Sequence, residues 1–288
     1  MSSGIADCGE IQLAYETFGS EKNPTVLLIM GLGTQMLAWN ESFCTALADR
    51  GFWVIRFDNR DIGLSTHLTG AGVPGFGGGS SSGVPYLLKD MADDSAGLLD
   101  ALGVEKAHIV GASMGGMIAQ EVAIHHPGRV LTLTSIFSTT APRIGAPTPA
   151  AAAALMRPPA GTEEEATARA LDVYRVIGSP GYPFDEERLT AVAREAFSRE
   201  KDPTGVARQF AAIQASGDRT GRLKDVAVPT LVIHGEDDPL VRPAGGTATR
   251  DAIPGARLIT FPGMGHDLPR EVWTPVIDAI TEHASSTT

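Results

Sequence analysis

The sequence predicts an α/β fold, with a mostly parallel central sheet that helices cover on both faces and that a helical segment interrupts. Two observations carry this prediction. Short apolar runs alternate with amphipathic helical patterns before residue 139 and again after residue 222, and this order is typical of parallel sheets packed between helices. Between these two regions, residues 139–222 contain helical patterns and no strand pattern.

The composition is that of an ordinary globular protein. The chain has 288 residues, of which 43% are hydrophobic and 20% are charged, so it can bury a sizeable core. Its 34 acidic and 23 basic residues give a net charge of -11. Binding to phosphates depends on Lys and Arg, so this balance argues against nucleic acids and anionic membranes as partners. We therefore expect a small-molecule partner, and no feature predicts an oligomeric state.

The elements of the sheet and of its covering helices follow from residue periodicity. Seven apolar runs have the length of strands: Ile11–Tyr15, Thr25–Met30, Trp53–Phe57, Ala107–Val110, Val130–Ile136, Thr230–His234 and Arg257–Phe261. Helices are predicted where apolar residues recur at helical spacing and where Gly or Pro ends the pattern: Ala38–Arg50, Tyr86–Leu102, a helix from the GASMGG turn to His125 or His126, Ala244–Ala252, and one from about Arg270.

The interrupting segment, residues 139–222, is predicted to be a helical cap on a core formed by residues 1–138 and 223–288. It follows the strand after the GASMGG helix, so it should emerge at the carboxyl edge of the sheet and roof the site there. Each of its three amphipathic helices has a polar residue suited to cap its first turn. These capping residues are Thr162, Asp185 and Asp202, the last followed by Pro203.

Three further features describe the chain outside these elements. The Gly-rich run Gly70–Gly83 is predicted to be a mobile surface loop. Cys8 and Cys44 form neither a disulfide framework nor a metal-ligand spacing. The first twenty residues lack the basic and apolar regions of a signal peptide, and the apolar stretch Val26–Met30 is far too short to span a membrane. We therefore expect a cytoplasmic protein.

The strongest chemical signal is the pentapeptide Gly111-Ala112-Ser113-Met114-Gly115. In a chain with 33 glycines this pattern could arise by chance. Its context is more specific, because a predicted strand precedes it and a predicted helix follows. The glycines then allow a sharp turn that exposes the serine at a helix N-terminus, where the helix dipole and free N–H groups favour negative charge. Ser113 is therefore predicted to be a nucleophile.

A nucleophilic serine needs a base, and His266 is the best placed of the seven histidines. It follows the predicted strand Arg257–Phe261, so it should lie at the carboxyl edge of the sheet, where ligands bind in open α/β folds. His234 also lies at a strand end and is the one competitor.

The base in turn needs an acid that holds its tautomer. The turn HGEDDPLV, residues 234–241, supplies three candidates, Glu236, Asp237 and Asp238. The pattern alone leaves the choice among them open. The chain order of serine, acid and histidine is that of α/β-hydrolases.

An oxyanion hole should come from two backbone N–H groups, those of Met114 and of a residue in the loop after strand Thr25–Met30. Leu32 is the natural donor in that loop, because Gly31 and Gly33 keep the backbone accessible on either side. A dinucleotide fingerprint is excluded because Met36 occupies the position of its third glycine. The chain also has no P-loop, H-E-x-x-H motif or zinc spacing, so we expect neither cofactor nor metal.

With these residues placed, the chain resembles the α/β-hydrolase superfamily over about residues 8–283. Within it, the chain is similar to the actinobacterial lipase and esterase group that includes aclacinomycin methylesterase. The resemblance rests on VLLIMGLGTQMLAW, IRFDNRDIGLST, AHIVGASMGGMIAQ, PTLVIHGEDDPLVRP and FPGMGHDLP. It implies that Asp238, just before proline and 28 positions before His266, is the acid of the triad. Two residues depart from the pattern: Asp61 replaces a usual glycine, and Met30 stands where many relatives have histidine.

The resemblance implies hydrolysis of carboxylic esters through an acyl-enzyme, with Ser113, His266 and Asp238 as the triad. A thioesterase, a lactonase or a cofactor-free perhydrolase would use the same residues, and a non-catalytic binding protein could keep the same fold. A serine nucleophile in place of aspartate argues against haloalkane dehalogenases and epoxide hydrolases. The apolar cap favours an apolar acyl or aromatic substrate. We expect contacts with this substrate from Gly31, Trp39, Tyr174 and Phe210.

Overall fold

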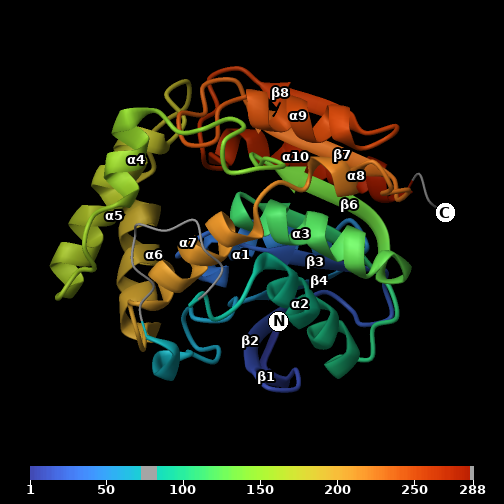
Figure 1. Ribbon diagram of the computed structural model, residues 1–288, viewed down its shortest axis with the longest axis horizontal. Helices are drawn as coiled ribbons and strands as arrows, with labels where there is room; N and C mark the ends of the chain where they lie inside the picture. Colours follow the sequence, from blue (N-terminus) through green and yellow to red (C-terminus); the bar gives the residue numbers. More distant parts are fainter. Residues whose placement is uncertain (73–82, 286–288) are drawn as a thin grey trace.

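A computed structural model describes residues 1–72 and 83–285, so most of the predicted loop Gly70–Gly83 lies outside the described residues. Eight strands form one sheet in the order β1-β2-β4-β3-β5-β6-β7-β8 (Figure 1). The strands are β1 (Ser2–Asp7), β2 (Gln12–Phe18), β3 (Thr25–Ile29), β4 (Trp53–Phe57), β5 (Ala107–Ala112), β6 (Val130–Ile136), β7 (Thr230–Gly235) and β8 (Arg257–Phe261).

The sheet is mostly parallel, as predicted. Strand β2 is antiparallel to both of its neighbours, β1 and β4, and every other pair is parallel. The edge strand β1 was not predicted, because its sequence SSGIAD is mainly polar and only Ala6 is buried. Backbone pairing with β2 over six residues, rather than burial of side chains, makes it a strand.

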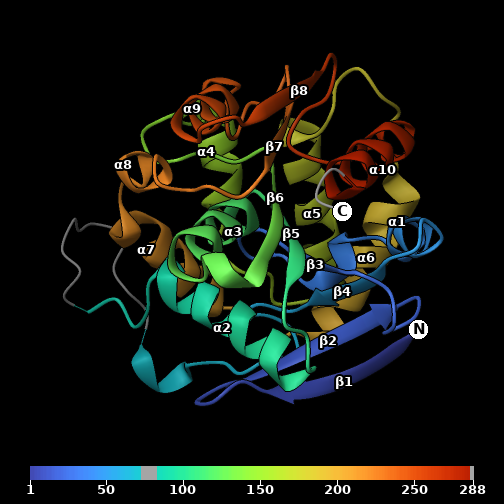
Figure 2. The same cartoon turned by 90° about the vertical axis from the view of Figure 1, so that its right-hand side faces the viewer.

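Helices cover both faces of the sheet, and each face has its own hydrophobic core (Figure 2). Helices α2 (Leu88–Ala101), α3 (Met114–His125) and α9 (Ala244–Ala252) lie on one face, and α1 (Glu41–Ala48) and α10 (Arg270–Ser285) on the other. Helix α1 was predicted to begin at Ala38. It begins at Glu41 because Asn40 accepts a hydrogen bond from the Ser42 N–H and caps the helix there.

The chain between β6 and β7 forms five helices and, in its described residues, no strand. These helices are α4 (Pro149–Leu155), α5 (Glu163–Ile177), α6 (Glu186–Arg199), α7 (Gly205–Ser216) and α8 (Thr220–Leu223). Figure 1 shows α4, α5 and α6 as one group, on the side of the molecule opposite the C-terminus. No helix among the described residues is long and apolar enough to cross a membrane.

The sequence predicted three of these five helices. Helices α5 and α6 begin at the expected caps, since Thr162 and Asp185 accept hydrogen bonds from backbone N–H groups of the first turn. The expected start of α7 was wrong. Asp202 accepts a hydrogen bond from the Thr204 N–H in a turn outside the helix, and α7 begins at Gly205. Helices α4 and α8 are short, with seven and four residues, and have little periodicity to detect.

Candidate active site

Ser113 occupies a sharp turn between β5 and α3. Its backbone has φ 58° and ψ -122°, a left-handed conformation that non-glycine residues rarely adopt and that marks strained functional positions. The turn is fixed by its neighbours. The Ser113 N–H donates to the Ile136 carbonyl at 2.9 Å, and the Ser113 carbonyl accepts from the Ser138 hydroxyl at 2.8 Å. The side chain is half-buried, so its hydroxyl remains accessible.

Two glycines make this turn possible. A Cβ atom on Gly111 would lie 2.0 Å from the Gly115 carbonyl oxygen, and one on Gly115 would lie 2.1 Å from the Ile29 carbonyl oxygen. Both distances are impossible for real atoms, so the turn, the helix and β3 approach one another through positions where no side chain fits. The pentapeptide thus has the steric role that its sequence context predicts.

His266 and Asp238 complete a chain of hydrogen bonds with Ser113. The His266 Nε2 atom lies 2.9 Å from the Ser113 Oγ, and the His266 Nδ1 atom lies 2.7 Å from the Asp238 Oδ2. The second Asp238 oxygen accepts from the Leu240 and Val241 N–H groups at 2.8 and 2.9 Å. The tautomer of His266 that carries its proton on Nδ1 would donate to the aspartate and accept from the serine, which is the arrangement required of a general base.

The other two acids of the HGEDDPLV turn point elsewhere. Asp237 accepts from the Gly263 N–H and Glu236 accepts from the Thr260 hydroxyl, and both are exposed. The competing histidine, His234, is buried behind the acid, with its Nε2 atom 2.7 Å from the Val241 carbonyl and 3.7 Å from the Asp238 Oδ2. Burial lowers the pKa of His234, so a neutral side chain supports the turn.

The loop after β3 brings backbone N–H groups to the nucleophile. Gly31 lies against the serine, since a Cβ on Gly31 would be 3.5 Å from the Ser113 Oγ. The N–H groups of Leu32 and Met114 have no hydrogen-bond acceptor in the described part of the chain. Two free donors beside a nucleophile are suited to the negative oxygen of a tetrahedral intermediate.

The other residues expected to contact substrate have different surroundings. Trp39 has 1% of its surface exposed and packs on Phe43 with ring centroids 5.6 Å apart, so it is part of the core. Tyr174 on α5 and Phe210 on α7 are half-buried. Burial and the charge of Asp267 raise the pKa of the Tyr174 hydroxyl. Substrate contact by any of these residues remains a prediction.

Sequence patterns missed two groups of polar residues near the site. Asp267 follows the histidine and lines a hollow of about 260 Å³ together with residues between 179 and 189 and residues 269–271. Burial raises its pKa, while a hydrogen bond from Ser179 opposes this effect. The second group, Arg208 and Gln209, is fully buried on α7. The sequence does show two adjacent polar residues among apolar neighbours on this predicted helix. It does not show which residues they would bond to.

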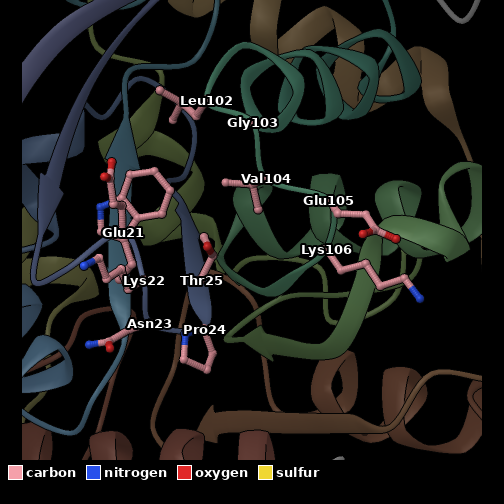
Figure 3. Close-up of a pocket in the computed structure, with 11 residues that line it drawn as sticks. Glu21, Lys22, Asn23, Pro24, Thr25, Leu102, Gly103, Val104, Glu105 and Lys106 are labelled. Atoms are coloured by element: carbon pink, nitrogen blue, oxygen red, sulfur yellow. The ribbon is translucent and has the colours of Figure 1, made fainter.

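A larger hollow, of about 520 Å³, lies at the opposite edge of the sheet (Figure 3). Thr25 and Trp53, the first residues of β3 and β4, line it together with residues 102–106 before β5. The nucleophile turn follows the carboxyl end of β5, so this hollow is separate from the active site. No group of three or more His, Cys, Asp or Glu residues suited to a metal ion occurs among the described residues.

Comparisons with known proteins identify the family of this chain. A family described as alpha/beta hydrolase fold matches residues 24–269. The chain is 31% identical to a rhodomycin D methylesterase from a Streptomyces species, over 97% of each chain. It is 29% identical to 3-oxoadipate enol-lactonase 2 from Acinetobacter baylyi, over 82% of this chain and 80% of the relative. Among solved structures, an enol-lactonase from Burkholderia xenovorans superposes with a TM-score of 0.73 at 27% identity, over 99% of each chain. The chain belongs to the α/β-hydrolase family.

Proposed function

We propose that this protein hydrolyses a methyl ester of a bulky, mainly apolar or aromatic small-molecule acid. The broader activity, carboxylic ester hydrolysis by a serine esterase, follows from its family and from its methylesterase relatives. The observation that carries the proposal is the continuous hydrogen-bonded chain from the Ser113 Oγ through His266 to Asp238, beside two free backbone donors. Roles for these residues follow from that geometry.

In this mechanism the Ser113 Oγ attacks the ester carbon while the His266 Nε2 takes its proton. Asp238 accepts the Nδ1 hydrogen bond and stabilises the imidazolium that forms. The N–H groups of Leu32 and Met114 hold the tetrahedral oxyanion. His266 then protonates the departing alcohol, which leaves an acyl-enzyme on Ser113. Water, activated by the same histidine, releases the acid and restores the serine.

Two observations support a methyl ester with a bulky acid. Two rhodomycin D methylesterases align with 97% of this chain, at 31% and 29% identity, so the likeness includes the cap. In addition, the cap approaches the loop after β3 closely: a Cβ placed on Gly33 would be 3.1 Å from a Val206 methyl group on α7. The small methanol leaving group needs little room, and the half-buried cap residues Tyr174 and Phe210 are available to the acid part.

We also propose that residues 139–222 act as a cap that sets substrate preference. Phe210→Ala should then shift the preference among esters of different acyl length, with much less effect on an acetate ester. An equal loss of activity for every ester length would contradict this role.

A second candidate function, lactone hydrolysis, is favoured by the enol-lactonase relative and by the enol-lactonase structure. The same triad would open a cyclic ester without releasing an alcohol. The two functions differ in which substrates fit beneath the cap, so a substrate panel separates them.

The proposal is tested with purified protein and a panel of aromatic and aliphatic methyl esters, thioesters and lactones. We expect the fastest turnover with a methyl ester of a bulky acid. Ser113→Ala should lower kcat by roughly 10⁴–10⁶, as in other triads, and should abolish labelling by a fluorophosphonate probe. Faster turnover of lactones would favour the second function, and labelling that persists in Ser113→Ala would contradict the nucleophile.

We further propose that the enzyme acts in the cytoplasm. Its two cysteines support this location, because Cys44 is a buried free thiol and Cys8 a partly buried one, and oxidising compartments favour disulfides. Fractionation of cells that produce the protein tests this proposal.

A further inference from the structure

A side chain of the cap is bonded directly to the loop that carries the predicted oxyanion donor. Gln209 on α7 is fully buried. Its Oε1 atom accepts from the Gly33 N–H at 2.9 Å, and its Nε2 atom donates to the Arg60 carbonyl at 2.8 Å. The amide thus bridges two loops of the core, one after β3 and one after β4, with one hydrogen bond to each.

The hydrogen bond to Gly33 fixes one particular peptide group. The Gly33 N–H and the Leu32 carbonyl belong to the same peptide plane, and the Thr34 hydroxyl donates to that carbonyl at 3.1 Å. The plane is therefore held at both ends, by the cap on one side and by the loop itself on the other. The adjoining peptide plane carries the Leu32 N–H. This second plane is also held by a hydrogen bond of 3.3 Å from the Thr34 N–H to the Gly31 carbonyl. The two planes meet at the Leu32 Cα atom, so rotation of the first plane would strain the second.

Helix α7 is also fixed to the second of these loops, the one after β4. Its first residue, Gly205, contacts the loop after β4 so closely that a Cβ there would lie 2.0 Å from the Asp61 carbonyl oxygen. One turn further on, the Arg208 guanidinium forms two hydrogen bonds of 2.8 Å to the Asp61 carboxylate. Both side chains are fully buried. A bidentate pair of this kind fixes position and orientation together, so α7 cannot shift without breaking it.

This pair also accounts for the unusual residue at position 61. Asp61 has φ 67°, a conformation that favours glycine, and the similar family has glycine there. The aspartate is retained in this conformation by its side chain, which accepts from the Tyr86 hydroxyl and the Leu68 N–H, both at 2.7 Å, as well as from Arg208. Asp61, which departs from the family pattern, is therefore paired with Arg208 on the cap.

Helix α6 is bonded to the later residues of the loop after β3. The Arg199 guanidinium on α6 donates to the Gln35 Oε1 at 2.9 Å and to the Asp58 Oδ2 at 2.6 Å. The other Asp58 oxygen accepts from the Met36 N–H at 2.8 Å. The loop from Gly31 to Met36 is thus bonded to the cap at two points.

We propose that Gln209 is a positioning residue for the oxyanion hole: through Gly33 it sets the orientation of the Leu32 N–H, so the cap contributes to transition-state stabilisation as well as to substrate choice. This inference rests on the proposed function of the Leu32 N–H. Stabilisation of an oxyanion requires donors held at 2.7–3.1 Å from a charge that develops only in the transition state. Loss of the hold on Leu32 should therefore lower kcat more than it raises KM.

The test uses Gln209→Met, which keeps the length of the side chain and removes both hydrogen bonds. Gln214→Met is the matched control, because Gln214 is exposed on the same helix. With an acetate ester, too small to fill the space under the cap, we expect kcat to fall about tenfold, the factor that corresponds to one ordinary hydrogen bond. KM should stay within about twofold. Gln214→Met should match the wild type in both constants.

A second readout, the rate of fluorophosphonate labelling, does not depend on ester turnover. The phosphonyl oxygen occupies the oxyanion hole as Ser113 attacks, so labelling should slow in Gln209→Met by about the same tenfold factor. If the wild type is labelled but hydrolyses no ester of the panel, the proposed function fails, and the ratio of labelling rates still decides this inference. Gln209→Asn serves if the first variant does not fold, because it keeps a buried amide that is too short to reach both partners.

The inference is overturned if a folded Gln209→Met or Gln209→Asn keeps kcat and labelling within about twofold of the wild type. It is also overturned if the loss is confined to KM for bulky esters, since Gln209 would then act on substrate fit alone.

Discussion

Removal of the Arg208 side chain should destabilise the protein far more than the loss of an ordinary ion pair. Arg208 is fully buried and donates to Asp61 at 2.8 Å twice, to Asp202 at 2.8 Å, to Thr204 at 2.9 Å and to the Gly72 carbonyl at 3.2 Å. The hydrogen bonds to Asp61 raise the pKa of the guanidinium, so Arg208 is charged at neutral pH.

The magnitude follows from what Arg208→Met leaves behind. The Asp61 carboxylate would stay fully buried, and its remaining partners in the described part of the chain would be the Tyr86 hydroxyl and the Leu68 N–H. Breaking a buried pair by removal of one partner costs about 3–5 kcal/mol in the free energy of unfolding. For a protein of this size that loss corresponds to roughly 6–20 °C in Tm. Urea unfolding, followed by circular dichroism, measures it.

Two further variants separate this effect from generic damage. Arg157→Met removes an exposed ion pair with Asp172, whose side chains are 43% and 46% exposed, and should cost less than about 1 kcal/mol. The double variant Asp61→Gly with Arg208→Met also removes the fully buried Asp61 charge and places glycine at φ 67°. It leaves only the Asp202 carboxylate without its arginine, and that side chain is 14% exposed. It should therefore be about 1–3 kcal/mol more stable than Arg208→Met alone. A cost below about 1 kcal/mol for Arg208→Met, or no recovery in the double variant, would refute this reasoning.

Two other predictions concern the acid of the triad and a buried histidine. Asp238→Asn should lower kcat by about 10⁴, because the wrong tautomer of His266 is then favoured. Asp237→Asn should have little effect, because the Asp237 carboxylate is exposed and accepts from the Gly263 N–H, and a larger loss in Asp237→Asn would reverse the assignment. Burial, together with the charge of His283, lowers the pKa of His108 from 6.5 to about 4. The unfolded chain therefore binds the extra proton first, and the free energy of unfolding should fall as the pH drops from 6.5 towards 4. His108→Gln should lose less stability in this interval than the wild type, as urea unfolding at several pH values would show, and equal losses would contradict the prediction.

Local sequence determined those parts of the molecule whose causes lie within a few residues. The strands Trp53–Phe57, Val130–Ile136 and Arg257–Phe261 have the predicted bounds, because a mainly apolar run between turn residues is enough to define a strand. The turn at Ser113 was predictable for the same reason. Its glycines and its flanking strand and helix are all contiguous, and the close approaches at Gly111 and Gly115 explain why no other residue serves.

Tertiary structure decided the features that depend on partners far along the chain. Periodicity and spacing left three acids open, and the hydrogen bond from His266 selects Asp238 across 28 positions. Periodicity also missed β1, which depends on backbone pairing rather than on burial. Trp39 packs on Phe43 in the core, which its sequence context did not predict, and its contact with substrate remains a prediction.

The hydrogen bonds from α7 to the loops after β3 and β4 show this dependence on distant partners most clearly. Gln209 and Gly33 are separated by 176 positions, and Arg208 and Asp61 by 147. The local sequence of α7 does not predict which carboxylate or backbone group each side chain contacts. A buried polar group is stable only when its hydrogen-bond partner is present, and only the folded chain brings these partners together.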